Sequence, residues 1–210
     1  MNLDRAGRAI VFDFGRVLFR WRPEAVVEQA LQHRLDANRD VAHWVAEIFQ
    51  AYEGDWQDFD RGTVDVPNLV RRIAVRTGLS EADVLAVVEA APDELQPLPD
   101  TVAWLRRLHA QGRPLHFLSN MPAPFAEVLE ESHDFMAHFE SGVFSARVQA
   151  VKPEPEIFER AAQTFGRPPS SLLLVDDLLP NIVAARAAGW HGVQFIDAKQ
   201  AEAEVVALGW

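Results

Sequence analysis

Cysteine is absent from the 210 residues of this chain, which excludes disulfide bridges, thiolate nucleophiles and thiolate metal sites. Basic residues are scarce beside acidic ones, 20 against 31, and the net charge of −11 opposes binding to nucleic-acid backbones and anionic membranes. Long apolar runs are also missing, so the sequence predicts neither a signal peptide nor a membrane span. We therefore expect a cytoplasmic protein with no nucleic-acid or membrane partner.

Apolar residues make up 49% of the chain, enough to bury one substantial core. A first strand is predicted at 9–12, and apolar residues then recur at helical spacing through 23–91 without a convincing strand. From residue 100 onward the pattern alternates between helices and strands. Strands are predicted at 114–118, 142–145, 171–175 and 191–196, with helices at 100–110, 121–131, 153–165 and 179–188.

This alternation predicts the α/β class, with a three-layer, Rossmann-like core in which helices cover both faces of a parallel sheet. The core domain would comprise residues 1–19 and 98–210, and residues 20–97 would form an all-helical cap domain inserted after the first strand. Prolines 92, 97 and 99 crowd the exit of the insertion and favour a semi-rigid hinge. Its position directly after a strand end suits a lid over a site, with a packing ornament as the alternative.

Carboxylates follow two of the predicted strands. Asp13 follows the strand at 9–12, and Gly15 is expected to let the backbone turn sharply and bring its carbonyl close to that carboxylate. Asp176 and Asp177 follow an apolar run, where adjacent negative charges repel unless a cation or a proton intervenes. The carboxyl ends of parallel strands meet at one edge of the sheet, and Mg²⁺ prefers oxygen ligands of this kind. An Asp-Asp turn on the surface is the alternative reading of the second pair.

Groups that bind anions follow the other strand ends. Ser119 and Asn120 come after the second strand, where a hydroxyl and the free N–H groups of a helix start favour an oxyanion, although a simple helix cap would look the same. Lys152 precedes a helix that begins at proline and would supply a local cation for an anionic substrate. With these neighbours, Asp13 could accept a phosphoryl group.

Taken together, these segments resemble the four motifs of the haloacid dehalogenase-like hydrolase superfamily. The matching segments are 13–18 (DFGRVL), 119–120 (SN), 152–153 (KP) and 176–177 (DD). The resemblance spans nearly the whole chain, because the helical insertion stands where this family carries its smaller cap. Within the family, the chain is most similar to sugar-phosphate phosphatases of the α-D-glucose-1-phosphate phosphatase type, and the segment 59–64 (FDRGTV) resembles part of their cap.

The resemblance implies a Mg²⁺-dependent phosphatase that hydrolyses a small phosphorylated metabolite such as a sugar phosphate. Asp13 would be the nucleophile that becomes an aspartyl phosphate. Ser119 and Lys152 would hold the transferring group, and Asn120 would help to orient it. Such an enzyme would need only a small-molecule partner, and it could be a monomer or a homodimer.

For the metal, the resemblance implies direct ligands from Asp13, the main-chain carbonyl of Gly15, and Asp177. Asp176 would be a further or water-mediated ligand. The chain departs from the usual phosphatase motif at Gly15, where the family usually has a second Asp that acts as general acid and base. A positioned acid is worth roughly 10²–10⁴-fold in rate. Its loss matters least when the leaving oxygen is already acidic, as in an anomeric sugar 1-phosphate or an acyl phosphate.

Residues near the nucleophile and on the insertion are candidates for choosing the substrate. Arg16 and Trp21 lie closest in sequence to Asp13 and are expected to bind substrate. Further candidates on the insertion are Arg20, Trp56, Asp60 and Arg61. For each of these the ordinary alternative is a core tryptophan or a solvated charge. His116 lies within a predicted strand, so a structural role is expected for it.

Two other functions fit part of the pattern. A dehalogenase of the same superfamily also lacks the second Asp, but it needs no metal and usually has neutral residues in place of Asp176 and Asp177. A non-catalytic phosphate- or sugar-binding protein of the same ancestry would explain Gly15. Retention of the predicted nucleophile, lysine and carboxylate pair favours the phosphatase.

Overall fold

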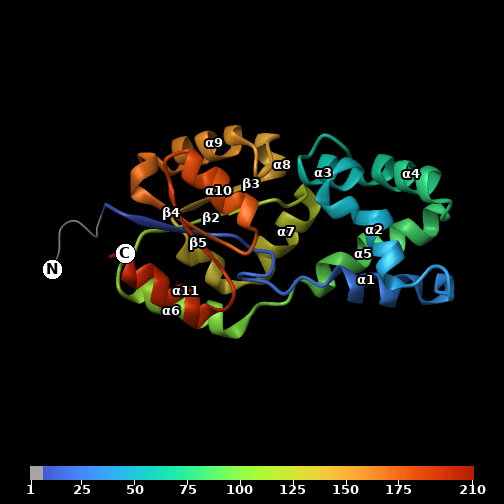
Figure 1. Cartoon of the computed structure of the whole chain (residues 1–210), viewed down its shortest axis with the longest axis horizontal. Coiled ribbons are helices and arrows are strands. Elements are labelled where there is room, and N and C mark those ends of the chain that lie inside the picture. Colours follow the sequence, from blue (N-terminus) through green and yellow to red (C-terminus); the bar gives the residue numbers. More distant parts are fainter. Residues whose placement is uncertain (1–6) are drawn as a thin grey trace.

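The computed structural model describes residues 7–210 (Figure 1). Residues 1–6 lie outside the described residues. They belong to the predicted core domain and to the N-terminal stretch for which no signal peptide is predicted. Five strands form one parallel sheet in the order β3-β2-β1-β4-β5. Their bounds are β1 Ala9–Phe12, β2 Leu115–Ser119, β3 Ser141–Phe144, β4 Leu172–Asp176 and β5 His191–Gln194. The predicted α/β class with a parallel sheet is confirmed.

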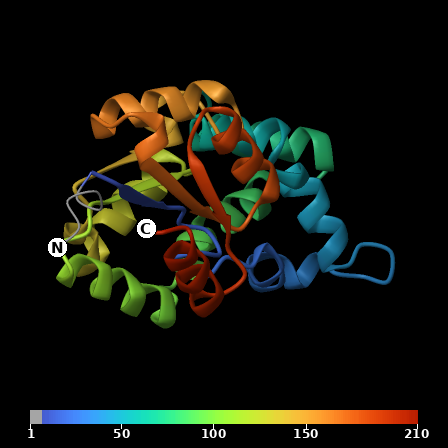
Figure 2. The ribbon, with the colours of Figure 1, turned by 60° about the vertical axis from the view of Figure 1, so that its left-hand side comes forward.

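Helices cover both faces of the sheet (Figure 2). Helices α9 (Pro155–Phe165) and α10 (Leu179–Ala187) lie on one face, and α6 (Pro99–Ala110) and α11 (Ala198–Ala207) lie on the other. Side chains of β1 alternate accordingly: Val11 packs with α9 and α10, while Phe12 packs with α6 and the edge-on ring of Trp104. Burial on both faces explains why β1 is a continuous apolar run.

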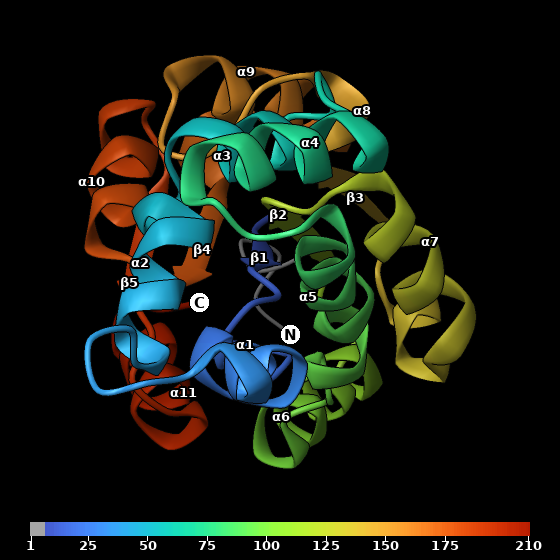
Figure 3. The ribbon, with the colours of Figure 1, turned by 90° about the vertical axis from the view of Figure 1, so that its right-hand side faces the viewer.

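The insertion forms a group of helices beyond the carboxyl ends of the strands (Figures 1 and 3). Its helices are α1 Pro23–Leu31, α2 Val41–Phe49, α3 Gly54–Asp60, α4 Val66–Thr77 and α5 Glu81–Glu94. The side chains of Asp40, Asp65 and Ser80 accept hydrogen bonds from the first turns of α2, α4 and α5, as expected for N-caps. Gly78 ends α4 in the left-handed conformation.

Some elements differ from the predictions. The short helices α3 and α8 (Ser145–Val148) were not predicted, and neither was α11, which follows the last strand. Helix α5 continues through Pro92 to Glu94, although a proline was expected to mark its exit. The proline falls in the last turn, where one lost hydrogen bond is outweighed by the packing of buried residues such as Val88 and Ala91.

The two chain segments that join the insertion to the sheet lie side by side. Phe19 pairs with Pro97, and the Arg20 N–H donates to the Gln96 carbonyl at 2.8 Å. The helical insertion is therefore connected through two paired segments rather than through independent proline linkers. Within residues 7–210, none of the helices has the length and apolarity needed to cross a membrane.

Candidate active site

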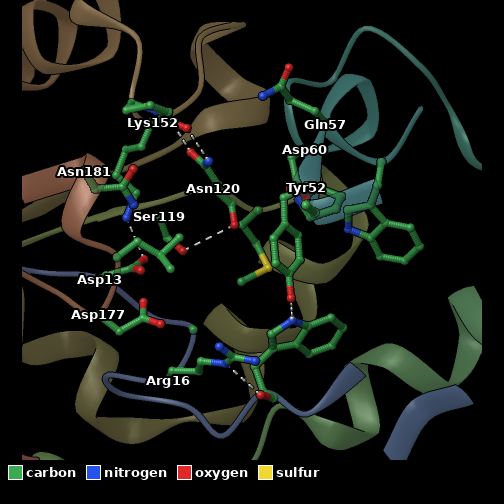
Figure 4. Close-up of a pocket in the computed structure, with 18 of the residues that line it drawn as sticks. Asp13, Arg16, Tyr52, Gln57, Asp60, Ser119, Asn120, Lys152, Asp177 and Asn181 are labelled. Carbon is green, nitrogen blue, oxygen red and sulfur yellow. Dashed lines mark hydrogen bonds and ion pairs between the residues drawn. The ribbon is translucent and has the colours of Figure 1, made fainter. Parts of the chain in front are cut away.

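A pocket of about 310 Å³ lies between the carboxyl ends of the strands and the helical insertion (Figure 4). Eight of the nine predicted site residues line it: Asp13, Gly15, Arg16, Trp21, Ser119, Asn120, Lys152 and Asp177. The ninth, Asp176, is fully buried at the end of β4, behind the pocket wall. The strand ends thus meet as the sequence predicts, because β1, β2 and β4 are neighbours in the parallel sheet.

Lys152 joins two carboxylates at the floor of the pocket. Its ammonium nitrogen lies 2.9 Å from the Asp13 Oδ1 and 2.6 Å from the Asp176 Oδ2. The residue is only 3% exposed. Burial opposes its charge, but the attraction of the two carboxylates prevails and holds the pKa of Lys152 above its usual value. Lys152 therefore presents a positive charge where the sequence predicts one.

Asp176 has hydrogen-bond donors on both carboxylate oxygens. Besides Lys152, it accepts from the Asn181 side-chain amide at 3.0 Å and from the Leu178 N–H at 2.9 Å. These bonds stabilise a buried carboxylate and fix the turn that carries Asp177. They also occupy the oxygens that a metal would use, which favours the water-mediated form of the predicted Asp176 role.

Asp13 and Asp177 face the pocket. Burial is the main cause that raises the pKa of Asp13 to about 7, and the two nearby aspartates add to it against the opposing effect of Lys152. Burial followed by the repulsion of Asp176 raises the pKa of Asp177 to about 6. One oxygen of Asp13 also accepts the Phe14 N–H at 2.7 Å. The positive charge near these two carboxyls is too small to offset their burial and the repulsion of the neighbouring aspartates.

The three carboxylates suit a divalent cation. One oxygen from each of Asp13, Asp176 and Asp177 lies within 4.8 Å of the others. Three potential negative charges face one lysine, so a cation at this place would relieve their repulsion. A set of hard oxygen ligands beside an open pocket fits Mg²⁺, which usually keeps positions for water and phosphate.

Gly15 does not have the backbone role expected from its sequence position. Its φ is not positive, and a Cβ built on it would meet no heavy atom within 4 Å. The left-handed residue in this turn is Arg16, with φ 58°. The expectation that glycine is needed for a sharp turn is therefore wrong, and a side chain at position 15 has room.

Ser119 is the last residue of β2 and Asn120 follows it, and their side chains make different contacts. The Ser119 hydroxyl is 3.5 Å from the Asn120 carbonyl, too long for a strong bond, so it remains available to an anion. The Asn120 side chain accepts the Lys152 N–H at 2.8 Å and donates to the Lys152 carbonyl at 2.9 Å. Its amide thus holds the loop that carries Lys152, and the expected role of Asn120 in orienting phosphate stays a prediction.

The wall on the insertion side is built partly from residues that were not predicted from the sequence. The Trp21 indole N–H donates to the Tyr52 hydroxyl at 2.6 Å, and the Arg16 guanidinium donates to the Trp21 carbonyl at 3.3 Å. Tyr52 and Gln57 also line the pocket. They come from residues 50–60, a segment with weak helical periodicity, and the one sequence signal was that Tyr52 is the only tyrosine in the chain.

The remaining candidates divide between pocket and framework. Trp56 and Asp60 line the pocket. Arg20 instead pairs with Glu94 at 2.8 Å. Arg61 pairs with Glu154 at 2.6 Å, so neither arginine is directed at substrate.

His116 has the structural role expected for it. It is 1% exposed, stacks on Phe165 at 4.3 Å, and pairs with the Ser141 hydroxyl at 2.9 Å. Burial lowers the pKa of His116 to about 4, so the ring stays neutral at physiological pH.

Two of the sequence relatives are phosphatases. A sesquiterpene phosphatase from Aspergillus oryzae is 26% identical over 90% of both chains. A phosphoglycolate phosphatase from Escherichia coli is 34% identical over half of this chain, and the match covers 42% of that relative's length.

Solved structures share the fold. A haloacid dehalogenase family enzyme from Bacteroides thetaiotaomicron, in complex with magnesium and inorganic phosphate, has a TM-score of 0.71 at 19% identity, covering 89% of this chain and 93% of the other. An L-2-haloacid dehalogenase from Xanthobacter autotrophicus has a TM-score of 0.66 at 18% identity, covering 95% and 82%. Mg²⁺, the predicted cofactor, is bound in three of the similar structures of this Bacteroides enzyme. The family model for haloacid dehalogenase-like hydrolases matches residues 6–189. The chain therefore belongs to the haloacid dehalogenase-like hydrolase family.

Proposed function

We propose that this hydrolase is a Mg²⁺-dependent phosphatase that removes phosphate from a small metabolite through an aspartyl phosphate on Asp13. The observation that carries the proposal is the position of the Asp13 carboxylate at the floor of the pocket, beside the Lys152 ammonium and the Asp177 carboxylate. A nucleophilic oxygen, a fixed cation and a set of metal ligands are the groups that phosphoryl transfer requires.

Each residue has a task in this reaction. An oxygen of Asp13 attacks phosphorus, and the bond from phosphorus to the leaving oxygen breaks. Lys152 and the Ser119 hydroxyl hold the phosphoryl oxygens. Asp13, Asp177 and the Gly15 carbonyl would hold Mg²⁺, with Asp176 behind them, and the bound ion would neutralise phosphate charge. Water then attacks phosphorus and restores the Asp13 carboxylate.

A dehalogenase reaction would also begin with attack by Asp13, and the fold alone does not separate the two activities. The local charges favour the phosphatase. Asp176 and Asp177 both retain carboxylates beside Asp13, an arrangement that is costly for a metal-free site but suits one that binds a cation.

The insertion, residues 20–97, would act as the cap that selects the substrate. Its wall presents the rings of Trp21, Tyr52 and Trp56 together with the Gln57 amide. Such a surface suits a sugar phosphate, with stacking on an aromatic ring and hydrogen bonds to hydroxyls. A phosphate ester of an apolar alcohol is the second candidate, favoured by the aromatic wall and by the terpene phosphatase relative.

The test is phosphate release from sugar 1-phosphates, other sugar phosphates, acyl phosphates, nucleotides and prenyl phosphates, each with Mg²⁺ and with EDTA. Metal-dependent release that is lost in Asp13→Asn is expected. Release that persists in Asp13→Asn would contradict the assigned nucleophile. Halide release from 2-haloacids without metal, in the absence of any phosphate release, would establish the dehalogenase instead. Binding of sugar phosphates with neither activity would indicate the non-catalytic alternative.

A further inference from the structure

An acid without an ion pair lies in the pocket, on the side of the insertion. Asp60 is the last residue of α3, is 6% exposed, and lines the same pocket as Asp13. Figure 4 places it beside Tyr52, across the pocket from the strand ends. Its carboxyl makes no hydrogen bond or ion pair with any residue between 7 and 210. A buried carboxyl without a donor is costly to ionise, so it needs an explanation.

The backbone of Asp60 is fixed to the sheet domain. The buried Ser145 hydroxyl donates to the Asp60 carbonyl at 2.5 Å and accepts the Met121 N–H at 2.9 Å. Met121 directly follows the Ser119-Asn120 segment of the site. One hydroxyl thus joins the end of α3 to the loop that carries the phosphate-binding serine.

The next two residues fix the same end of α3 by other contacts. Arg61 forms a bidentate ion pair with Glu154, at 2.6 and 2.7 Å, two residues beyond Lys152. A Cβ on Gly62 would lie 2.6 Å from the Ala146 carbonyl oxygen, so the backbones approach more closely than a side chain permits. The backbone that carries Asp60 is therefore held in a defined place at the insertion side of the pocket.

The surroundings of Asp60 favour its protonated form. Burial is the main cause that raises its pKa to about 8, and the charge of Asp13 adds to it. The other ionisable groups that line the pocket are Arg16, Tyr52, Glu53, Lys152 and Asp177. The adjacent Arg61 is paired with Glu154 and directed elsewhere.

We propose that Asp60, supplied by the insertion, is the general acid and base that the chain lacks at Gly15. The inference rests on the proposed phosphatase function and names a further catalytic residue for it. It also removes the restriction to acidic leaving groups that Gly15 implied, because a positioned proton donor is available for ordinary alkoxides.

Asp60 would give up one proton in the first step of the reaction and regain one in the second. When Asp13 attacks phosphorus and the ester oxygen leaves, the Asp60 carboxyl proton passes to that oxygen and an alcohol departs. Asp60 is then a carboxylate. It accepts a proton from the water that attacks the aspartyl phosphate, the bond from phosphorus to Asp13 breaks, and phosphate leaves with Asp60 protonated again.

The first experiment measures kcat and kcat/KM of the wild type and Asp60→Asn on a series of alkyl and aryl phosphates with Mg²⁺. For alkyl phosphates, kcat/KM of Asp60→Asn should fall about 10²–10⁴-fold. For p-nitrophenyl phosphate it should change less than about tenfold, because nitrophenolate leaves without a proton. Water attack should now be slow, so Asp60→Asn should show a burst of about one nitrophenolate per active site.

Asp58→Asn is the matched control. Asp58 lies on α3 like Asp60, but its half-exposed carboxylate pairs with Arg72 of α4, so its removal should leave activity unchanged. Gly15→Asp combined with Asp60→Asn tests the role itself: position 15 has room for a side chain, and an acid there should restore turnover of alkyl phosphates. A substrate-binding role for Asp60 would not be rescued in this way.

Equal losses on alkyl and aryl phosphates, without a burst, would overturn the inference. If Asp60→Asn does not fold, the wild type still decides: weak dependence of kcat/KM on leaving-group basicity is expected, and steep dependence would overturn the inference. Failure of the proposed function looks different, because the wild type would then release no phosphate or would release it without Asp13.

Discussion

The two sides of the pocket each contain a buried aspartate, but they differ in the hydrogen-bond donors around it. On the sheet side, Asp176 is fully buried and accepts hydrogen bonds from Lys152, Asn181 and the Leu178 main chain. On the insertion side, Asp60 is almost as buried, yet its carboxyl has no donor among residues 7–210. Burial alone therefore does not fix the state of a carboxyl, since the donors around it decide whether a charge is tolerated.

This difference divides the chemistry between the walls. The sheet side holds charges in place, and in the account proposed here it binds Mg²⁺ and phosphate and supplies the nucleophile. The insertion side is aromatic and holds one neutral acid, which suits substrate selection and proton transfer. Substitutions on each wall should therefore have different effects, and the largest is expected at Lys152.

Lys152→Met should remove most activity and destabilise the protein by about 3–5 kcal/mol, because two buried carboxylates lose their shared partner. Chemical unfolding of the metal-free protein measures the stability. The chain offers a matched control in Lys199→Met, which alters its only other lysine, an exposed residue of α11. If Lys152→Met lowered the free energy of unfolding as little as Lys199→Met, Lys152 would not stabilise the carboxylates of the sheet wall.

Asp60→Asn should change how stability depends on pH. The pKa of Asp60 rises on folding from an ordinary value near 3.8 to about 8, so the folded state holds a proton that the unfolded state releases. Its contribution is fully present below about pH 4 and is lost as the pH rises to about 8, with a slope of up to about 1.4 kcal/mol per pH unit.

The measurement is urea unfolding of the metal-free protein between pH 4 and 9. Asp13 and Asp177 also have raised pKa values, so both proteins should lose stability with rising pH. The difference between wild type and Asp60→Asn isolates Asp60, and the variant should gain relative stability as the pH rises. If the free energies of unfolding of the two proteins changed with pH in parallel, Asp60 would ionise equally in the folded and unfolded states. That result would contradict a neutral Asp60 on the insertion wall.

Ser145→Ala should cost about 1–3 kcal/mol, because it leaves the buried Met121 N–H without its acceptor. It should also lower kcat more for alkyl than for aryl phosphates, since it loosens the backbone of Asp60. Thermal unfolding and the leaving-group series measure the two effects. A stability loss with no change in leaving-group preference would separate Ser145 from the positioning of Asp60.

Arg61→Gln should have the smallest effect on stability, at most about 1 kcal/mol, because its ion pair with Glu154 is partly exposed. The measured quantity is the midpoint of urea unfolding at low and at high salt. Salt should reduce the difference between wild type and variant. A loss of several kcal/mol would show that this pair fixes the insertion to the sheet far more strongly than its exposure indicates.

The sheet wall was predictable because its information is local. Each predicted residue there stands directly after an apolar strand or before a helix, and parallel strands bring such positions to one edge. Even so, the sequence did not reveal that the Asn120 amide binds the Lys152 main chain, which depends on two segments 32 residues apart.

The insertion wall was less predictable because long-range packing decides which side chains enter the pocket. Arg20 and Arg61 look alike as candidates, but their carboxylate partners lie 74 and 93 residues away. Asp60 was one candidate among several, and its neighbour Arg61 is directed away from the pocket. Nothing local to residues 50–60 distinguishes the side chains that enter the pocket from those that pair elsewhere.

In the proposed reaction, the phosphoryl group passes through Asp13. The most direct measurement is rapid acid quenching of the Mg²⁺-loaded enzyme with a radiolabelled phosphorylated substrate, followed by peptide mapping. We predict base-labile label on the peptide that contains Asp13, removed by a chase with unlabelled substrate and absent in Asp13→Asn. Labelled phosphate released by the wild type with no label on Asp13 at any time, even in Asp60→Asn, would contradict the account.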